Sequence, residues 1–146
     1  MARIVVGVDG SPGAHAALQW AAQEASLRRA TLEVVLVWQY PPFLDVWGPP
    51  PPPRHDLEAA AQATLDRVVG AIEGVEGVEV VASLVEGSPA EVLVTAGLDA
   101  DMIVVGSRGH GGFTGLLLGS VSQYCVTHAR CPVVVVPSKA RSAEQH

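Results

Sequence analysis

The chain alternates short apolar runs with longer segments in which apolar residues recur at helical spacing. Each run is almost continuously apolar rather than alternating, a pattern typical of strands buried on both faces of a parallel sheet. The segments between the runs are long enough to be the crossover helices that parallel strands require. We therefore predict an α/β protein with five strands, at residues 3–8, 31–38, 78–85, 102–105 and 133–136.

Four helices are predicted between these strands, and two of them have clear start signals. Ser11 can cap a helix that begins at Pro12 and runs to about residue 29, because serine is a preferred N-cap and proline suits the first helical position. Ser88, Pro89 and Glu91 have the pattern of a capping box with a first-position proline, for a helix that ends at residue 96 or 97. The other two helices are expected at residues 55–72 and 119–128.

Strands joined by right-handed crossovers in this order are expected to form a single-domain, doubly wound, five-stranded parallel sheet with the strand order 3-2-1-4-5 and helices on both faces. The direction of winding reverses between the first and fourth strands, and such sheets bind ligands at the carboxyl ends of those two strands. Asp9 follows the first predicted strand and Gly106 follows the fourth. The topology therefore brings these two turns to one predicted site.

The segment after the fourth predicted strand reads Gly-Ser-Arg-Gly-His-Gly-Gly over residues 106–112, and Gly119-Ser120 stands at the start of the next helix. A strand that leads through a glycine-rich loop into a helix N-terminus presents backbone N–H groups that bind phosphate. The chain has no Gly-Lys-Ser/Thr triplet of a Walker A loop. Thr114 stands where the Rossmann fingerprint needs its last glycine. The sequence thus predicts a nucleotide-phosphate site of a third kind.

The spacing Gly106-x2-Gly109-x9-Gly119-Ser120, followed by the segment at 131–136, resembles the ATP-binding branch of the universal stress protein family. Residues 4–11 resemble the opening of that family, so the match covers nearly the whole chain. The resemblance implies that the glycine-rich loop binds ribose and phosphates and that the next helix binds phosphates at its N-terminus. The residues implicated in nucleotide binding are Gly7, Val8, Asp9, Val37, Gly106, Ser107, Arg108, Gly109, His110, Gly111, Gly112, Gly119, Ser120, Val121 and Ser122.

Individual roles within this set follow partly from chemistry and partly from the resemblance. The resemblance implies that backbone atoms of Val37 meet the adenine. Asp9 is either a turn former or a carboxylate that accepts from the nucleoside or helps to hold a divalent ion. Arg108 is either solvated or in contact with phosphate. His110 could act as a general base, yet the sequence nominates no nucleophile for it to activate.

We therefore expect a regulatory module of the stress response that binds ATP, either alone or with Mg²⁺, and that is not an enzyme. A slow ATP-hydrolysing or phosphotransfer enzyme on the same site is the alternative. The sequence does not distinguish among ATP, ADP, AMP and cyclic AMP, because backbone N–H groups bind phosphate whatever the number of phosphate groups in the ligand. No catalytic residue is assigned.

Charge, hydropathy and cysteine usage indicate which kinds of partner, location and metal site to expect. A net charge of −6 with no lysine or arginine stripe argues against a nucleic-acid partner. No stretch approaches 18 uninterrupted apolar residues, so we expect no membrane association and a cytoplasmic location. Cys125 and Cys131 have neither the number nor the spacing of a zinc site, which predicts reduced thiols and no metal ligands. Residues 1–137 are expected to form the domain and residues 138–146 a flexible tail.

Two further segments suggest contacts with other molecules. The last strand, Val133, Val134, Val135 and Val136, is a uniformly apolar edge strand, and we expect it to form a homodimer by pairing with a second copy, as the family resemblance also implies. The connection over residues 40–53 contains seven prolines, which favour extended polyproline II structure. This connection is either a semi-rigid tether or a lid or partner-docking loop that uses Phe43 and Trp47.

Overall fold

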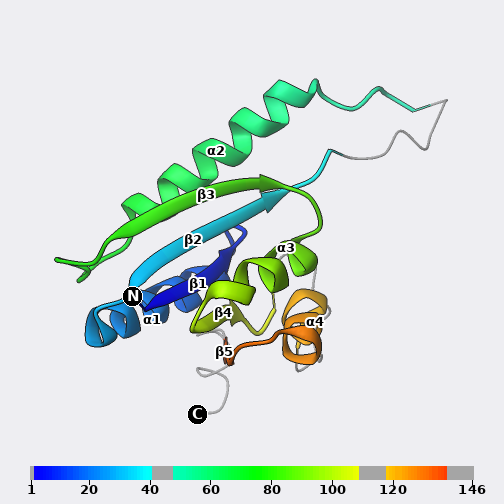
Figure 1. Ribbon diagram of the computed structural model, residues 1–146. Coiled ribbons are helices and arrows are strands. Elements are labelled where there is room, and N and C mark those ends of the chain that lie inside the picture. The colour runs from blue at the N-terminus through cyan, green and yellow to red at the C-terminus, as the bar shows by residue number, and fades with distance from the viewer. Residues whose placement is uncertain (1, 41–47, 109–117, 138–146) are drawn as a thin grey trace, which may run out of the picture.

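The computed structural model describes residues 2–40, 48–108 and 118–137. Within these ranges the chain forms a five-stranded sheet in the order β3-β2-β1-β4-β5, and every neighbouring pair is parallel (Figure 1). This confirms the predicted fold class and strand order. The strands are β1 (Arg3–Val8), β2 (Thr31–Trp38), β3 (Val80–Glu86), β4 (Met102–Gly106) and β5 (Val133–Val136).

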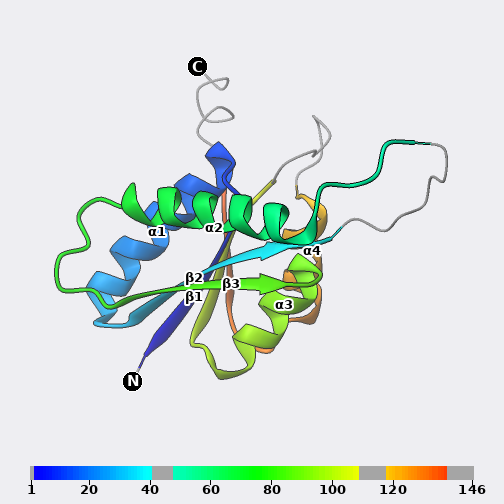
Figure 2. The same ribbon diagram turned by 90° about the horizontal axis from the view of Figure 1, so that it is seen from above.

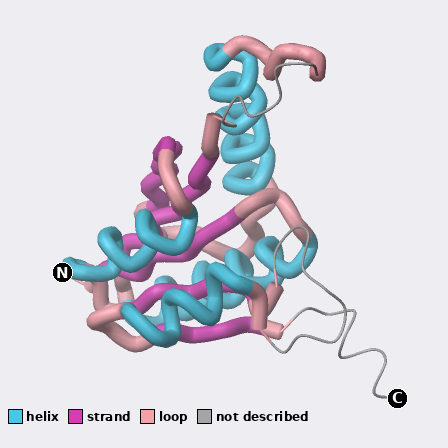
Figure 3. Tube along the Cα trace, turned by 90° about the vertical axis from the view of Figure 1, so that its right-hand side faces the viewer, coloured by secondary structure: helices cyan, strands magenta, loops and turns pink. Residues whose placement is uncertain are grey.

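Helices cover both faces of the sheet, as the near-continuous apolar strands predict. Viewed from above, α1 and α2 lie on one side of the strands and α3 lies on the other (Figure 2). The trace seen from the side shows the same layering, with the strands running between helices (Figure 3). The helices are α1 (Pro12–Arg28), α2 (Arg54–Gly70), α3 (Pro89–Ala96) and α4 (Ser120–His128), and the short 3₁₀ helix η1 (Gly97–Asp99) follows α3.

The core consists of two apolar clusters, one on each face of the sheet. Alternate residues of β1 point to opposite faces, so that Ile4 and Val6 belong to the cluster under α1 and α2, whereas Val5 belongs to the cluster under α3 and α4. Alanines dominate the buried face of α1, and their small side chains let this helix pack closely on the sheet. The buried residues of α1 are Gly13, Ala14, Ala17, Leu18, Ala21, Ala22 and Ala25.

The two predicted helix caps have different outcomes. The Ser11 side chain accepts a hydrogen bond of 3.2 Å from the backbone N–H of Ala14, and Pro12 occupies the first turn, which confirms the cap of α1. Helix α3 begins at Pro89 as predicted, but Ser88 makes no side-chain capping bond, so the predicted capping box is wrong. Instead, the backbone carbonyl of Ser88 accepts from the N–H of Val92.

The boundaries of several elements also differ from the prediction by one or two residues; helix α4, for example, begins at Ser120 rather than residue 119. Strand β3 begins at Val80 rather than residue 78, because the backbone N–H of Val78 donates to the carbonyl of Val75 in a turn. Helix α2 begins at Arg54 and ends at Gly70 rather than spanning 55–72. Strand β4 includes Gly106, which is paired with Val136 of β5. The last shift places the first glycine of the glycine-rich segment within the sheet.

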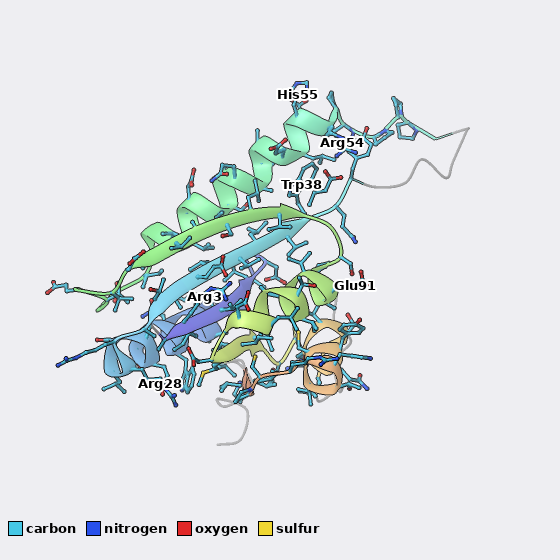
Figure 4. The ribbon with its side chains drawn as sticks, viewed as in Figure 1. Arg3, Arg28, Trp38, Arg54, His55 and Glu91 are labelled. Carbon is cyan, nitrogen blue, oxygen red and sulfur yellow. The ribbon has the colours of Figure 1, made fainter. Side chains whose placement is uncertain are left out.

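An arginine joins the two ends of the proline-rich connection. Nη1 of Arg54 lies 2.6 Å from both carboxylate oxygens of Glu86, at the end of β3. The guanidinium carbon lies 4.8 Å from the centre of the Tyr40 ring and 5.8 Å from the Trp38 ring, within cation–π range. Figure 4 shows Trp38 and Arg54 side by side at this end of the sheet. Residues 48–53 lead outward from α2 (Figure 1), and the predictions for Phe43, Trp47 and the tail at 138–146 lie outside the described residues.

Candidate functional site

A pocket of about 240 Å³ opens at the carboxyl ends of β1 and β4, where the winding of the sheet reverses. This is the position that the topology predicts for a ligand. Strands β1, β2 and β4 supply one part of the lining, and the N-terminal parts of α1, α3 and α4 supply another. The lining residues are Gly7, Val8, Asp9, Ala14, Val35, Val37, Pro89, Leu93, Val105, Gly106, Arg108, Ser120, Val121 and Ser122.

The lining separates into chemically different groups. Val35 and Val37 of β2 and Leu93 of α3 provide apolar surface and belong to, or pack against, the core cluster beneath α3 and α4. Asp9, Arg108 and Ser120 provide charge and hydrogen-bonding groups near the ends of β1 and β4 and at the start of α4. A ligand that fills such a pocket combines an apolar, flat group with a polar or anionic group.

The turn after β1 positions the one carboxylate among the described lining residues. Asp9 is exposed, and its Oδ1 accepts a hydrogen bond of 2.9 Å from the backbone N–H of Ser11. Gly10 has a φ of 84°, a left-handed conformation that glycine adopts without strain. Because Ser11 also caps α1, the turn ties the Asp9 carboxylate to the start of that helix. The turn thus fixes the backbone on which Asp9 is presented at the mouth of the pocket.

The start of α4 is fastened to the end of β4. The backbone N–H of Gly119 donates to the carbonyl of Ser107, and the N–H of Ser107 donates to the carbonyl of Val136 at 2.9 Å. The buried Ser122 hydroxyl lies 3.0 Å from the carbonyls of both Ser107 and Gly119. The first N–H groups of a helix have no intrahelical acceptor, and Ser120 and Val121 line the pocket at this point. The arrangement offers N–H donors and a positive helix end to an anion.

The predicted site residues that fall within the described ranges come together here, with two exceptions. Ser107 and Gly119 are not among the lining residues; their backbone hydrogen bond holds the start of α4 against the end of β4, and Gly119 directly precedes the lining residue Ser120. The Ser107 hydroxyl is buried and has no hydrogen-bond partner among the described residues. Gly109, His110, Gly111 and Gly112 lie outside the described residues.

Five lining residues were not predicted from the sequence: Ala14, Val35, Pro89, Leu93 and Val105. Val35 could have been found by strand alternation, because it shares a sheet face with the predicted Val37. Val105 could have been found from its place at the end of β4, directly before the predicted Gly106. Pro89 and Leu93 lie on a helix far from the glycine-rich segment in the sequence. They reach the pocket because α3 packs across the same face of the sheet.

The described residues contain no clustered metal site, and neither cysteine lines the pocket. Within residues 2–40, 48–108 and 118–137, no three His, Cys, Asp or Glu side chains form a group that could hold a metal ion. Cys125 and Cys131 are free thiols, as predicted, and Cys125 is fully buried. Burial raises the pKa of the Cys125 thiol to about 11, with a smaller contribution from Cys131. No helix in the described part of the chain is both long and apolar enough to cross a membrane.

The fold and the pocket define a doubly wound α/β domain with a pocket at the switch point of its sheet, where folds of this class bind ligands. The model of the universal stress protein family matches residues 1–137. The chain therefore belongs to the universal stress protein family. A universal stress protein of Mycolicibacterium smegmatis is 38% identical over 136 residues, which cover 91% of this chain and 45% of that protein. The chain thus spans about half the length of the curated relatives that it matches.

Solved structures of the family have the same fold. The universal stress protein from Archaeoglobus fulgidus in complex with dAMP is 29% identical, with a TM-score of 0.66 and coverage of 93% of this chain and 98% of that one. A protein of the family from Burkholderia pseudomallei is 30% identical, with a TM-score of 0.70 and coverage of 93% and 96%. These likenesses extend over nearly all of both chains.

Proposed function

We propose that this chain is a regulatory domain that binds ATP in the switch-point pocket and changes its interactions with other proteins according to the bound nucleotide. The observation that carries the proposal is the division of the pocket lining. The apolar surface of Val35, Val37 and Leu93 suits a purine base, and the first turn of α4 beside Arg108 suits phosphates. The Archaeoglobus fulgidus relative, solved with dAMP, supports an adenine nucleotide as the ligand class.

The residues present fit a triphosphate with a divalent cation. Arg108 supplies positive charge on the lining, and Ser120 adds a hydroxyl where α4 presents its N–H groups. The Asp9 carboxylate is an oxygen ligand of the kind that Mg²⁺ prefers, and Mg²⁺ usually takes only one or two protein carboxylates when phosphates complete its shell. In this proposal Asp9 would help to hold the cation, which when bound would supply charge to neutralise the phosphates beside the start of α4.

Thermal denaturation in the presence of nucleotide tests this proposal. At about one hundred times its dissociation constant, ATP should stabilise the fold by roughly 2.7 kcal/mol, which corresponds to an increase of about 5 to 10 °C in Tm. Gly119→Val should remove the increase, because a branched side chain at the N-cap blocks the approach of phosphate to α4. Gly70→Val is the matched control, since a Cβ at Gly70 meets no atom within 4 Å. A full ATP-dependent increase in folded Gly119→Val would contradict the assignment.

A phosphate-release assay on the same protein distinguishes nucleotide binding from ATP hydrolysis. We propose that hydrolysis is absent or far slower than the roughly 1 to 1,000 per second of typical enzymes. Asp9 is the one candidate base among the described lining residues, and its exposed carboxylate is hydrogen-bonded to the turn. Steady-state phosphate release within the enzyme range, abolished in Asp9→Ala, would favour the alternative of an ATP-hydrolysing enzyme.

A further inference from the structure

Leu93 supplies part of the apolar lining of the pocket. It lies in the middle of α3, is only 3% exposed, and packs in the cluster that contains Val5 and Val35. Its side chain also lines the pocket. Leu93 is therefore supported by the core from below while it presents atoms to the cavity above.

The Leu93 side chain occupies space that is open only because residue 7 is glycine. A Cβ built on Gly7 would lie 2.6 Å from Cδ1 of Leu93, closer than Cβ atoms approach in proteins, and 3.1 Å from Cδ2, which is a tight contact. Gly7 is in β1 and lines the same pocket. The helix and the strand thus meet by direct contact between the leucine methyl groups and the glycine backbone, and the two residues form one continuous wall.

We propose that Leu93, seated against Gly7, is the residue that determines which nucleobases the pocket accepts. Its methyl groups set the depth of the apolar part, so that an unsubstituted adenine fits and a base with an added group on the edge that meets Leu93 is excluded. The inference rests on the proposed function, because it takes the base to lie on the apolar surface. That placement follows from the position of the N–H donors and Arg108, which leave Val35, Val37 and Leu93 for the base.

Packing lets Leu93 restrict the size of the bound group more than Val35 and Val37 do. Val35 and Val37 are strand residues with short, branched side chains, and their backbone is fixed in the sheet, Val35 by pairing with both β1 and β3 and Val37 by pairing with β3. Leu93 projects from a helix and packs over a glycine that has no side chain, so its truncation should enlarge the pocket that both residues line. A single methylene in an apolar pocket changes discrimination by about 10- to 200-fold. Truncation of Leu93 should therefore change which ligands bind, besides changing how tightly they bind.

The test measures dissociation constants of the purified chain for AMP and for AMP analogues that carry a methyl or benzyl group at C2, N6 or C8. Wild type is expected to bind AMP and to bind at least one analogue about 10-fold or more weakly. Leu93→Ala should reverse this preference, with a relative gain of about 10-fold or more for that analogue. Leu93→Val, which removes less volume, should show a smaller change in the same direction. The same relative affinities in wild type and both variants would overturn the proposal.

A second experiment tests the contact between the two residues. Gly7→Ala should weaken AMP binding by about 10-fold or more, because the new methyl group displaces Leu93 into the cavity. Leu93→Ala in the Gly7→Ala background should restore much of this loss, since it removes the group that the methyl group strikes. Independent effects of the two substitutions would contradict the proposed wall.

Leu65→Ala is the matched control for truncation of a buried leucine. Leu65 is 1% exposed and belongs to the cluster on the opposite face of the sheet, away from the pocket lining. Leu65→Ala should lower stability without changing the relative affinities for the analogues. If wild type binds AMP and Leu93→Ala keeps the wild-type preference, this inference fails and the proposed function stands. If wild type binds no adenine nucleotide, both fail.

Discussion

At the scale of single residues, Gly106 is required by packing before any ligand is considered. A Cβ at this position would lie 3.0 Å from the backbone oxygen and 3.1 Å from the carbonyl carbon of Gly13, in the first turn of α1. These are backbone atoms of a helix, which cannot move aside as a flexible side chain can. The contact holds the end of β4 close to the first turn of α1, beside the pocket that Gly106 and Ala14 line.

Gly106→Ala is therefore expected to destabilise the fold by about 1 to 3 kcal/mol, as other overpacking substitutions do. Gly70→Ala is the paired substitution, because Gly70 ends α2 and a Cβ there meets no atom within 4 Å. Alanine favours the helix over glycine, so Gly70→Ala should stabilise by up to about 1 kcal/mol. Urea denaturation measures both free energies of unfolding. Similar stability for the two variants would show that the contact with Gly13 is easily relieved.

The buried Cys125 thiol gives a prediction that depends on pH. Its pKa is raised from 9.0 to about 11, chiefly by burial, so alkylation of Cys125 by iodoacetamide at pH 8 should be much slower than alkylation of the half-buried Cys131. The unfolded chain loses this proton at lower pH than the folded chain, so the contribution to stability is complete below pH 9 and decreases between pH 9 and 11. Peptide mass spectrometry reports the order of labelling, and equal rates in the native protein would contradict it.

At the scale of elements, the two serine-proline helix starts look alike in sequence but differ in structure. Ser11 is only 6% exposed, and its hydroxyl accepts a hydrogen bond from the backbone N–H of Ala14. The Ser88 side chain makes no such bond. Ser11→Ala should therefore cost about 1 kcal/mol of stability, and Ser88→Ala should cost a few tenths at most. Chemical denaturation of the two variants provides the comparison. An equal loss in both would mean that Ser88 caps α3 in solution.

The elements were predictable where local pattern and tertiary structure agree. Strands β1, β2 and β5 have their predicted bounds, because each is a continuous apolar run between clear breaks. The start of β3 was not predictable, since Val78 is as apolar as its neighbours and only the turn bond to Val75 removes it from the strand. The capping box failed for a related reason: the sequence supplies the residue types, but the backbone at the entry to α3 determines whether the bond forms.

The site was predictable to the extent that topology alone places residues. Asp9 and Gly106 lie at the ends of neighbouring strands at the switch point, so the predicted topology places them at one site. Both residues line the pocket. Pro89 and Leu93 could not be predicted in this way. Their place in the pocket depends on how far α3 lies across the sheet and on the space above Gly7, and neither is encoded by a local motif.

At the scale of the whole molecule, the sheet has two edge strands that differ in composition and exposure. Strand β3 carries Ser83 and Glu86 and has Val81 40% exposed. Strand β5 is four consecutive valines, each half-buried and hydrogen-bonded to β4 on one side. Alternate valines of β5 pack against the clusters on opposite faces of the sheet. Of the two edges, β5 therefore offers an apolar strand that is continuous with both layers of the core.

We propose that two copies associate by antiparallel pairing of their β5 strands across a two-fold axis, because one self-complementary edge then satisfies the backbone groups of both copies. Replacement of Val134 and Val136 by lysine should give a monomer, since like charges on paired strands repel and the apolar contact is lost. Val81→Lys is the matched control, because it places a lysine on an exposed position of the opposite edge and should leave the dimer intact. Light scattering measures the mass of each variant. A dimer that survives both lysines on β5 and dissociates with Val81→Lys would place the interface on β3 instead.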